Sequence, residues 1–147
     1  MIYSHQTKPR MWSPTIEVVS CICWYNDTFL CLLREKSKRE GNKWGFPAGK
    51  VLEGENKEKA LKREFQEELN LTLPETTFLK EFFVRYPKID FCFNVFEATF
   101  GDIPEIKIST AENSRYEWMT PREFLSSPVV NGNAEILEAL YPKALAV

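Results

Sequence analysis

The run from Lys57 to Leu69, KEKALKREFQEEL, has the spacing of one amphipathic helix, yet it places acidic side chains at the edge of the face that should be buried. At about 100° per residue, its apolar side chains form a stripe roughly 80° wide, made of Leu61, Phe65 and Leu69. Glu68 lies only about 20° from the first residue of this stripe, with Glu64 about 60° and Glu67 about 120° away. Carboxylates crowded beside an apolar surface repel one another and lose hydration, so this helix needs a positive partner.

Segments with strand character precede and follow this helix. The predicted strands are residues 15–25, 29–34, a short segment within 44–55, 76–86, 90–100 and 114–120. Two further helices are predicted at 121–127 and 134–141. The strands 76–86 and 90–100 are expected to pair antiparallel across Pro87 and Lys88. This order of elements predicts an α+β fold, an α/β/α sandwich in which helices pack on a mixed β-sheet.

Length and composition restrict the class of protein. The 147 residues suit a single domain, which we place at 15–147 behind an irregular arm at 1–14 that contains Pro9 and Pro14. No window is long and apolar enough for a membrane helix, and the start of the chain has no apolar core of a secretory signal, so no membrane is expected. A net charge of −2 gives no global attraction to nucleic acid.

Cysteine and histidine usage disfavours a zinc site. The four cysteines form no CxxC pair, and the single histidine, His5, is far from them in sequence. All four cysteines stand in apolar, strand-like segments, which favours reduced thiols in the core. Reduced thiols are typical of a reducing compartment, so a cytoplasmic location is expected.

Residues 49–71, GKVLEGENKEKALKREFQEELNL, resemble the Nudix box, G-x5-E-x7-R-E-U-x-E-E-x-G-U, in which U is a bulky apolar residue. The matching residues are Gly49, Glu55, Arg63, Glu64, Phe65, Glu67, Glu68 and Leu71. Asn70 stands where the box has its second glycine, and asparagine is the next most tolerant residue for a left-handed helix end. The flanking WGFPAGK and YEWMT also resemble this family. The likeness covers roughly 15–141 and is closest to the MutT-like branch of the Nudix hydrolases.

The spacing of the glutamates predicts a site for a hard cation. Glu64, Glu67 and Glu68 stand at i, i+3 and i+4, so they converge on one side of the helix, and carboxylate oxygens suit Mg²⁺, with Mn²⁺ as a substitute. The resemblance implies that these three glutamates bind the metal together with the carbonyl of Gly49. It also implies that Arg63 pairs with the box glutamates, and Arg63 and Glu67 are correctly spaced for this contact.

The resemblance implies hydrolysis of a diphosphate linkage, with a metal that polarises phosphoryl oxygens and a general base that assists water. In this family the base is either a box glutamate or a glutamate on a distant loop. Catalytic roles are therefore assigned to Glu67, Glu64, Arg63 and, on the loop STAENS, Glu112. Glu112 can equally be an ordinary exposed loop residue, and Glu117 is the weaker candidate because it lies within a predicted strand.

Substrate-binding roles are assigned to Asn133, Arg34, Lys50 and Phe46. Asn133 matches the position at which MutT-like proteins hydrogen-bond a purine base, although it can also cap the last helix. Arg34 belongs to a loop with several basic residues that either hold phosphates or are only solvated. Phe46, like Trp44 and Tyr86, is a candidate for stacking on a base or for the core.

Four functions remain open on the sequence. The leading one is a Mg²⁺-dependent nucleoside triphosphate pyrophosphohydrolase that releases a monophosphate and pyrophosphate. The alternatives are a pyrophosphatase for ADP-ribose or a nucleotide sugar, suggested by Pro87, and a pyrophosphohydrolase for the 5′ end of RNA, suggested by the basic loop. A non-catalytic nucleotide-binding domain is disfavoured because all three box glutamates are present. The chain is expected to act as a monomer or a homodimer on a small nucleotide.

Overall fold

The computed structural model describes residues 3–5, 14–86 and 89–145. Its strands are β1 (Tyr3–His5), β2 (Pro14–Tyr25), β3 (Thr28–Arg34), β4 (Trp44–Gly45), β5 (Ala48–Lys50), β6 (Thr77–Tyr86), β7 (Ile89–Thr99) and β8 (Asn113–Met119). Its helices are α1 (Lys57–Leu69), α2 (Pro121–Leu125), α3 (Asn133–Leu140) and α4 (Pro142–Leu145). The predicted strands and helices are confirmed to within two residues at almost every boundary.

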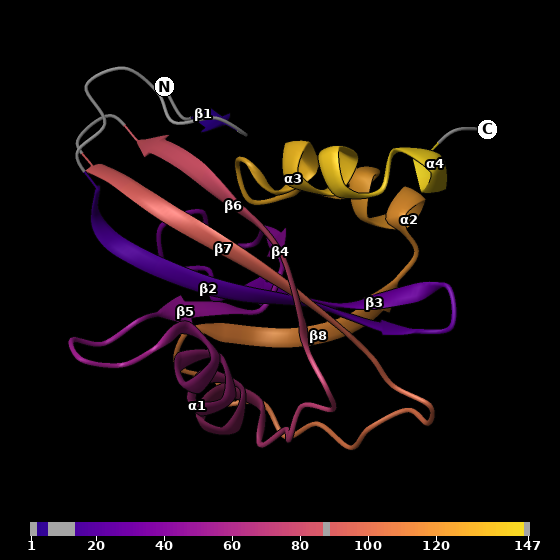
Figure 1. The fold of residues 1–147 in the computed structure, drawn as a ribbon. Helices are drawn as coiled ribbons and strands as arrows, with labels where there is room; N and C mark the ends of the chain where they lie inside the picture. The colour runs from indigo at the N-terminus through magenta and orange to yellow at the C-terminus, as the bar shows by residue number, and fades with distance from the viewer. Residues whose placement is uncertain (1–2, 6–13, 87–88, 146–147) are drawn as a thin grey trace.

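The strands form one mixed sheet (Figure 1). Its hydrogen-bonded order is β1-β6-β7-β2-β3-β4, with β5 added to β2 and β8 added to β3. β2 and β7 run parallel, with Val19 opposite Asn94, whereas β6 and β7 are antiparallel as predicted. The turn residues Pro87 and Lys88 lie outside the described residues. The mixed sheet predicted from the order of elements is confirmed.

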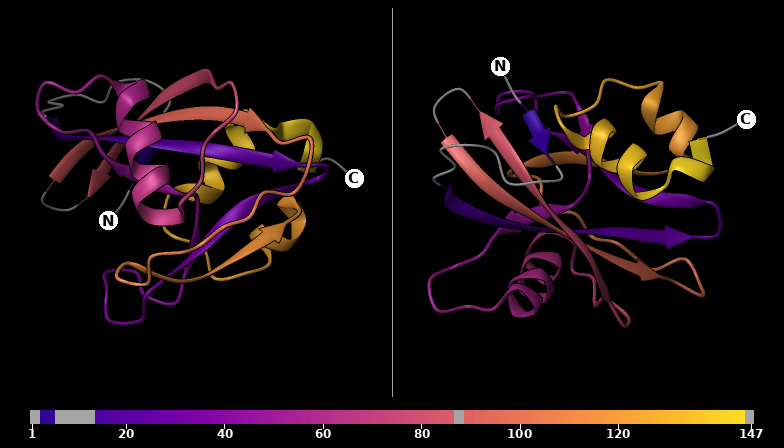
Figure 2. Two further views of the ribbon diagram at one scale, coloured as in Figure 1. Left: turned by 90° about the horizontal axis from the view of Figure 1, so that it is seen from below. Right: turned by 45° about the horizontal axis from the view of Figure 1, so that its top comes forward.

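Helices cover both faces of the sheet. Figures 1 and 2 show α1 on one face and α2, α3 and α4 grouped on the other. On the first face, Leu61 and Phe65 of α1 pack in a buried cluster with β2 residues such as Val19. On the second face, Phe124 of α2 and Ile136 of α3 belong to a separate buried cluster. The structure is therefore the predicted α/β/α sandwich, and α1 is anchored to the sheet by its apolar stripe.

Local sequence explains why α1 begins and ends where it does. Asn56 caps its first turn, because its Oδ1 accepts a hydrogen bond of 2.8 Å from the backbone N–H of Lys59. Asn70 ends the helix in the left-handed region at φ 51°, and its Nδ2 donates to the carbonyl of Lys107 at 2.9 Å. The tolerance expected of asparagine at the second glycine of the box is confirmed. The loop that leads to β8 is thereby held against the end of α1.

Two sequence expectations change with the structure. The arm at 1–14 is not wholly irregular, because Tyr3–His5 form β1 and pair antiparallel with β6, while residues 6–13 lie outside the described part. Helix α4 begins at Pro142, directly after α3, and was not predicted.

The cysteines lie in the core. Cys21, Cys23 and Cys31 are buried free thiols, and Cys92 is buried as well. No helix in the described ranges has the length and apolarity needed to span a bilayer.

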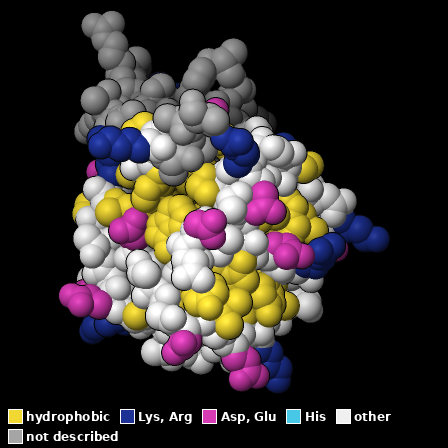
Figure 3. All heavy atoms as spheres, turned by 90° about the vertical axis from the view of Figure 1, so that its right-hand side faces the viewer, with side chains coloured by type: hydrophobic (Ala, Val, Ile, Leu, Met, Phe, Trp, Pro, Cys, Tyr) yellow, Lys and Arg dark blue, Asp and Glu magenta, His cyan; other side chains and the backbone are white. Residues whose placement is uncertain are grey.

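One end of the molecule presents apolar and charged side chains in a mixed pattern. Figure 3 views the side formed by the β2–β3 turn and by α2 and α4, where yellow apolar patches are interrupted by single acidic and basic side chains. The described part of this face has no broad basic field. This mixture agrees with the net charge of −2 and gives no electrostatic platform for a polyanion.

Candidate active site

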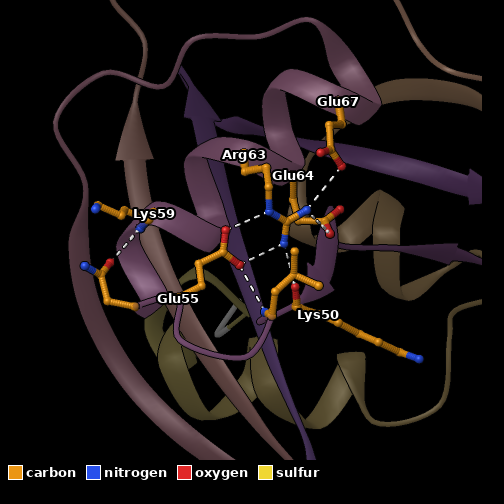
Figure 4. A network of polar contacts seen from close by, with 8 residues as sticks. Lys50, Glu55, Lys59, Arg63, Glu64 and Glu67 are labelled. Carbon is orange, nitrogen blue, oxygen red and sulfur yellow. Dashed lines mark hydrogen bonds and ion pairs between the residues drawn. The ribbon is translucent and has the colours of Figure 1, made fainter.

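Arg63 is the centre of a network of ion pairs on the exposed side of α1 (Figure 4). Its Nε donates to Glu55 Oε2 at 2.7 Å, and its Nη1 donates to Glu64 Oε1 at 3.0 Å and to Glu67 Oε2 at 3.1 Å. Its Nη2 donates to Glu55 Oε1 at 3.0 Å and to the carbonyl of Lys50 at 2.9 Å. The pairing predicted between Arg63 and the glutamates of the helix is confirmed. One guanidinium thus joins α1, the end of β5 and the loop between them.

Glu55 fixes the junction between this loop and α1. Its Oε1 also accepts a hydrogen bond of 3.0 Å from the backbone N–H of Leu52. The hydrogen bonds from Arg63, and then that from Leu52, lower the pKa of Glu55 to about 2. Glu55 is therefore ionised at neutral pH. The preceding Gly54 adopts a φ of 78°, which turns the loop towards the helix.

Gly49 lets the carboxylate of Glu64 approach the backbone of β5. A Cβ atom on Gly49 would lie 2.1 Å from Cδ and 2.2 Å from Cγ of Glu64, so any other residue would displace this side chain. The backbone at Gly49 is itself held by pairing with Val19 of β2. Glu64 is therefore the group that needs the space left by this glycine.

Two of the helix carboxylates lie in an environment that disfavours their charge. Burial raises the pKa of Glu64, with the charges of Glu67 and Glu112 adding to the increase and Arg63 opposing it. Burial also raises the pKa of Glu68, followed by repulsion from Glu112, Glu64 and Glu67. Glu68 Oε2 is sealed from solvent and has no hydrogen-bond partner among the described residues. The structure therefore places Glu112, a loop residue far away in sequence, within electrostatic reach of the helix carboxylates.

The residues present fit a divalent cation by their chemistry, although they are not assembled around one. Across the described ranges, no three Asp, Glu, His or Cys side chains are arranged to hold a metal ion as they stand. Arg63 binds the carboxylates of Glu64 and Glu67 in this arrangement. The unpaired Glu68 Oε2 and the mutual repulsion of hard oxygen donors are the features that a bound cation would relieve.

A cavity of about 470 Å³ opens beside this network, a size typical of sites for small ligands. One part of its wall is apolar: Ile16, Val18, Leu32, Phe46, Phe91 and Phe93. The polar part of its wall includes Arg34, Arg39, Lys50, Glu112, Asn113 and Asn133. The structure thus gathers Asn133, Arg34, Lys50, Phe46 and Glu112, all predicted from sequence, around one cavity. Glu64, Glu67 and Glu68 of α1 are not part of its wall.

Asn133 does not cap α3. The cap position is Gly132, at a φ of 94°, and no side chain makes a capping hydrogen bond there. Instead Asn133 Oδ1 accepts a hydrogen bond of 3.0 Å from the backbone N–H of Phe46, on the connection between β4 and β5. The cap interpretation of Asn133 is wrong. Its Nδ2 has no hydrogen-bond partner in the described part of the chain.

The aromatic ring of Phe46 is part of the core. Only 6% of the residue is exposed, and its ring stacks on Phe124 with centroids 5.3 Å apart and planes at 17°. A second ring, that of Phe29, lies 5.9 Å away. Phe46 is therefore a core residue that lines the cavity, and its ring is not an exposed surface on which a base could stack.

The basic residues near the cavity differ in how they are held. Arg34 Nε donates to the carbonyl of Arg39 at 2.9 Å, which fixes the guanidinium at the cavity wall. Lys43 pairs with Glu40 at 3.5 Å. Lys36 and Lys38 of the same loop are exposed outside the cavity wall. Only part of the predicted basic loop is thus in a position to meet a ligand.

Sequence reasoning missed two polar residues of the cavity wall, Glu40 and Asn113, as site residues. Glu40 Oε1 accepts a hydrogen bond of 2.8 Å from the backbone N–H of Asn131, which ties the basic loop to the segment before α3. Asn113 directly follows Glu112 and begins β8. No periodicity or motif marks these positions, because they meet the cavity only through the pairing of distant strands.

Comparison with known proteins relates the chain to one family. A family model described as the NUDIX domain matches residues 14–140. The MutT protein from Methanosarcina mazei Go1 is similar, with 21% identity, a TM-score of 0.78 and coverage of 91% of this chain and 98% of that one. No match was found among curated proteins.

Two further structures with similar folds were determined with ligands. The NUDIX domain of Shewanella oneidensis NrtR, complexed with ADP ribose, has 17% identity, a TM-score of 0.74 and 90% coverage of both chains. A bifunctional NMN adenylyltransferase/ADP ribose pyrophosphatase from Francisella tularensis, complexed with AMP and Mn ion, has 18% identity and a TM-score of 0.69. In that case the alignment covers 91% of this chain and 43% of the other. At these identities the likeness concerns the fold.

Proposed function

Because the chain belongs to the NUDIX family, whose members are hydrolases of pyrophosphate bonds, we propose that it cleaves nucleoside triphosphates into a monophosphate and pyrophosphate. The observation that carries this proposal is the placement of a nucleotide-sized cavity beside the helix that bears Glu64, Glu67 and Glu68. The cavity combines an apolar wall, suited to a base, with arginine and lysine side chains, suited to phosphates.

The proposed cofactor is Mg²⁺, with Mn²⁺ as a substitute. Glu64, Glu67 and Glu68 would hold it together with the carbonyl of Gly49, because hard oxygen donors match these ions and Glu68 Oε2 lacks any other partner in the described structure. When bound, the ion polarises phosphoryl oxygens and stabilises the leaving phosphate. Arg63 positions the helix carboxylates through its hydrogen bonds to Glu55, Glu64 and Glu67.

Hydrolysis requires that a water oxygen bond to phosphorus while the bond from phosphorus to the bridging oxygen breaks. Glu112 is proposed to accept the proton of this water, because it lines the cavity and its charge acts on Glu64 and Glu68. Arg34 and Lys50, which also line the cavity, are proposed to bind the phosphates. The guanidinium of Arg34 is already oriented by its bond to the carbonyl of Arg39, which reduces the entropy lost on binding.

The state of Asn133 restricts the base that it would recognise. Its Oδ1 accepts from the N–H of Phe46, which orients the amide, and its Nδ2 makes no hydrogen bond among the described residues and is available to donate to a ligand. A donor pairs with an acceptor such as the keto oxygen of guanine, hypoxanthine or uracil, whereas an exocyclic amino group offers it no acceptor. We therefore expect triphosphates of keto bases to be the better substrates.

The proposal is tested with a panel of ribo- and deoxyribonucleoside triphosphates incubated with Mg²⁺, with products separated by chromatography. A monophosphate and pyrophosphate are expected in equal amounts. Glu67→Gln is the matched control, since this exposed side chain can change without disturbing the core, and it should abolish turnover while the fold is retained. If no nucleoside triphosphate is turned over, this assignment is wrong.

A second candidate reaction is the hydrolysis of ADP-ribose to AMP and ribose 5-phosphate. The observation that favours it is the similar fold of the NrtR NUDIX domain, which was determined in complex with ADP ribose. Pro87, which suggested this substrate from sequence, lies outside the described residues. Adding ADP-ribose and a nucleotide sugar to the panel separates the two reactions, because only the second candidate releases AMP from ADP-ribose.

A third candidate is removal of pyrophosphate from the 5′ end of RNA, favoured by the presence of Arg34 and Arg39 at the cavity. A triphosphorylated oligonucleotide tests it, and an unchanged 5′ triphosphate after prolonged incubation counts against it. A purely binding role would give nucleotide affinity without turnover of any member of the panel. The presence of Glu64, Glu67 and Glu68 in α1 argues for catalysis.

A further inference from the structure

Asn113 is a buried polar side chain in the cavity wall that the proposed reaction does not use. Only 8% of the residue is exposed, although the cavity it lines is open to solvent. Within the part of the chain that the structure describes, its side-chain amide makes no hydrogen bond. The amide is also not among the side-chain groups sealed from solvent, so it faces accessible space. A buried amide normally has hydrogen-bond partners, and the amide of Asn113 can reach a partner only in the cavity.

The backbone holds Asn113 firmly in place. Asn113 begins β8 and pairs with Arg34 of β3, next to a shift in the register of the two strands. The preceding carbonyl, that of Glu112, accepts a hydrogen bond of 2.8 Å from the backbone N–H of Glu35. A side chain on such a fixed strand end binds a ligand with little loss of backbone entropy.

Asn113 shares the cavity wall with residues that are proposed to bind the two ends of a nucleotide. It pairs with Arg34 across β3 and β8, so it adjoins a residue that is proposed to bind the phosphates. Asn133, proposed to meet the base, is bonded to Phe46 on the connection between β4 and β5. The group that joins a base to phosphates is the sugar. Resting on the function proposed above, we propose that Asn113 is a specificity-determining residue whose amide hydrogen-bonds a hydroxyl group of the sugar.

An amide is chemically suited to a hydroxyl. Asn113 Oδ1 accepts from the hydroxyl hydrogen and Nδ2 donates to the hydroxyl oxygen, so both polar atoms of the amide are useful. A phosphate, in contrast, accepts from Nδ2 only and is better bound by the guanidinium of Arg34 on the neighbouring strand. A site built to hydrogen-bond a hydroxyl rejects the analogue that lacks it, because its polar atoms are then left unpaired.

The test combines a protein substitution with removal of the sugar hydroxyls. The wild type and Asn113→Leu, which keeps the shape but removes both polar atoms, are assayed with the best triphosphate of the panel and with its 2′-deoxy and 2′,3′-dideoxy forms. In the wild type, removal of the hydroxyl that Asn113 binds should lower kcat/KM about tenfold, mainly through KM. Asn113→Leu should lose about tenfold on the ribonucleotide and less than twofold on the dideoxynucleotide.

The control is Ser114→Ala, which removes an exposed neighbouring hydroxyl and should match the wild type on every sugar. An equal loss on all three sugars would overturn the proposal, since the amide would then serve the phosphates, the base or the fold. No loss on any sugar would also overturn it, since the amide would then not contact the substrate. If Asn113→Leu does not fold, Asn113→Ala is judged by the same ratio, and equal kcat/KM of the wild type on ribose and dideoxyribose overturns the proposal by itself.

Failure of the proposed reaction is distinguished by a binding measurement. Affinities of the wild type and Asn113→Leu for a nucleoside monophosphate and its 2′,3′-dideoxy form are measured by calorimetry, which needs no turnover. A tenfold preference for the ribose form that disappears in Asn113→Leu supports the sugar contact even if no triphosphate is hydrolysed. The absence of this preference removes the sugar contact even if triphosphates are substrates.

Discussion

Replacing Glu68 with glutamine removes a charge that folding places against the core. In the protein as described, Glu68 Oε2 is sealed from solvent without a hydrogen-bond partner, and burial raises its pKa. A charged group that is buried without a partner costs more than a neutral one, and we take this difference as about 1 kcal/mol because only one of the two oxygens is sealed. Without metal, Glu68→Gln should therefore be more stable than the wild type by about 1 kcal/mol, or about 2–4 °C in Tm.

The order of stabilities should reverse when Mg²⁺ is added. A cation that binds only the folded wild type stabilises it by about 2.7 kcal/mol at a hundredfold excess over Kd. Glu68→Gln lacks one of the three proposed ligands and should gain little from the ion. Thermal unfolding followed by circular dichroism, first in EDTA and then over a Mg²⁺ titration, measures both changes in one experiment. Turnover should fall in the same variant.

The matched control is Glu67→Gln. Glu67 is the neighbour of Glu68 on the same helix, but its side chain is 58% exposed. It should abolish the response to Mg²⁺ while leaving the Tm in EDTA almost unchanged, since its ion pair with Arg63 is a surface pair worth less than about 1 kcal/mol. If Glu68→Gln melts below the wild type in EDTA, or is stabilised by Mg²⁺ as strongly as the wild type, the account of this carboxylate is refuted.

Three other substitutions test separate parts of the site. Gly49→Ala should lower kcat about a hundredfold with a small change in Tm, because its Cβ would lie 2.1 Å from Glu64 Cδ and displace that carboxylate; wild-type kcat would contradict this. Asn133→Ala should raise KM about tenfold and lower the free energy of unfolding by about 1–2 kcal/mol, as measured in urea, because a buried N–H loses its acceptor. The pKa of Glu55 is lowered to about 2 by Arg63, so its ion pair stabilises the fold above the unfolded value of 4.5 and is lost as pH falls from there towards 2. Glu55→Gln should make the urea midpoint less sensitive to pH in that window, and an unchanged acid dependence would contradict the assignment.

Elements with strong local patterns were predictable from the sequence. Helix α1 begins and ends at the predicted residues because Asn56 and Asn70 supply the caps and the apolar stripe sets the buried face. The pairing of Arg63 with Glu67 follows from helical spacing and is confirmed. Each of these features depends on residues close together in the chain, where backbone geometry alone determines which side chains meet.

Predictions failed where contacts between distant segments decide the outcome. The sequence allows Asn133 to be either a helix cap or a base contact. In the structure its Oδ1 accepts a hydrogen bond from the backbone N–H of Phe46, which is far away in sequence. The arm at 1–14 contains a strand because β6 offers an edge for Tyr3–His5 to pair with. A polar side chain has several satisfactory partners, and only the packed arrangement of strands selects among them.

The sequence by itself determined the chemistry of α1: three carboxylates on one side of a helix, an arginine spaced to hold them and an apolar stripe that anchors them. Helical geometry places residues three and four apart together in any fold, which is why this part was readable. The tertiary structure alone decided what surrounds that helix. It brought Glu112 within electrostatic reach of Glu68, turned Phe46 into a core wall and left the amide of Asn113 facing the cavity. These relations depend on strand register, which no local spacing specifies.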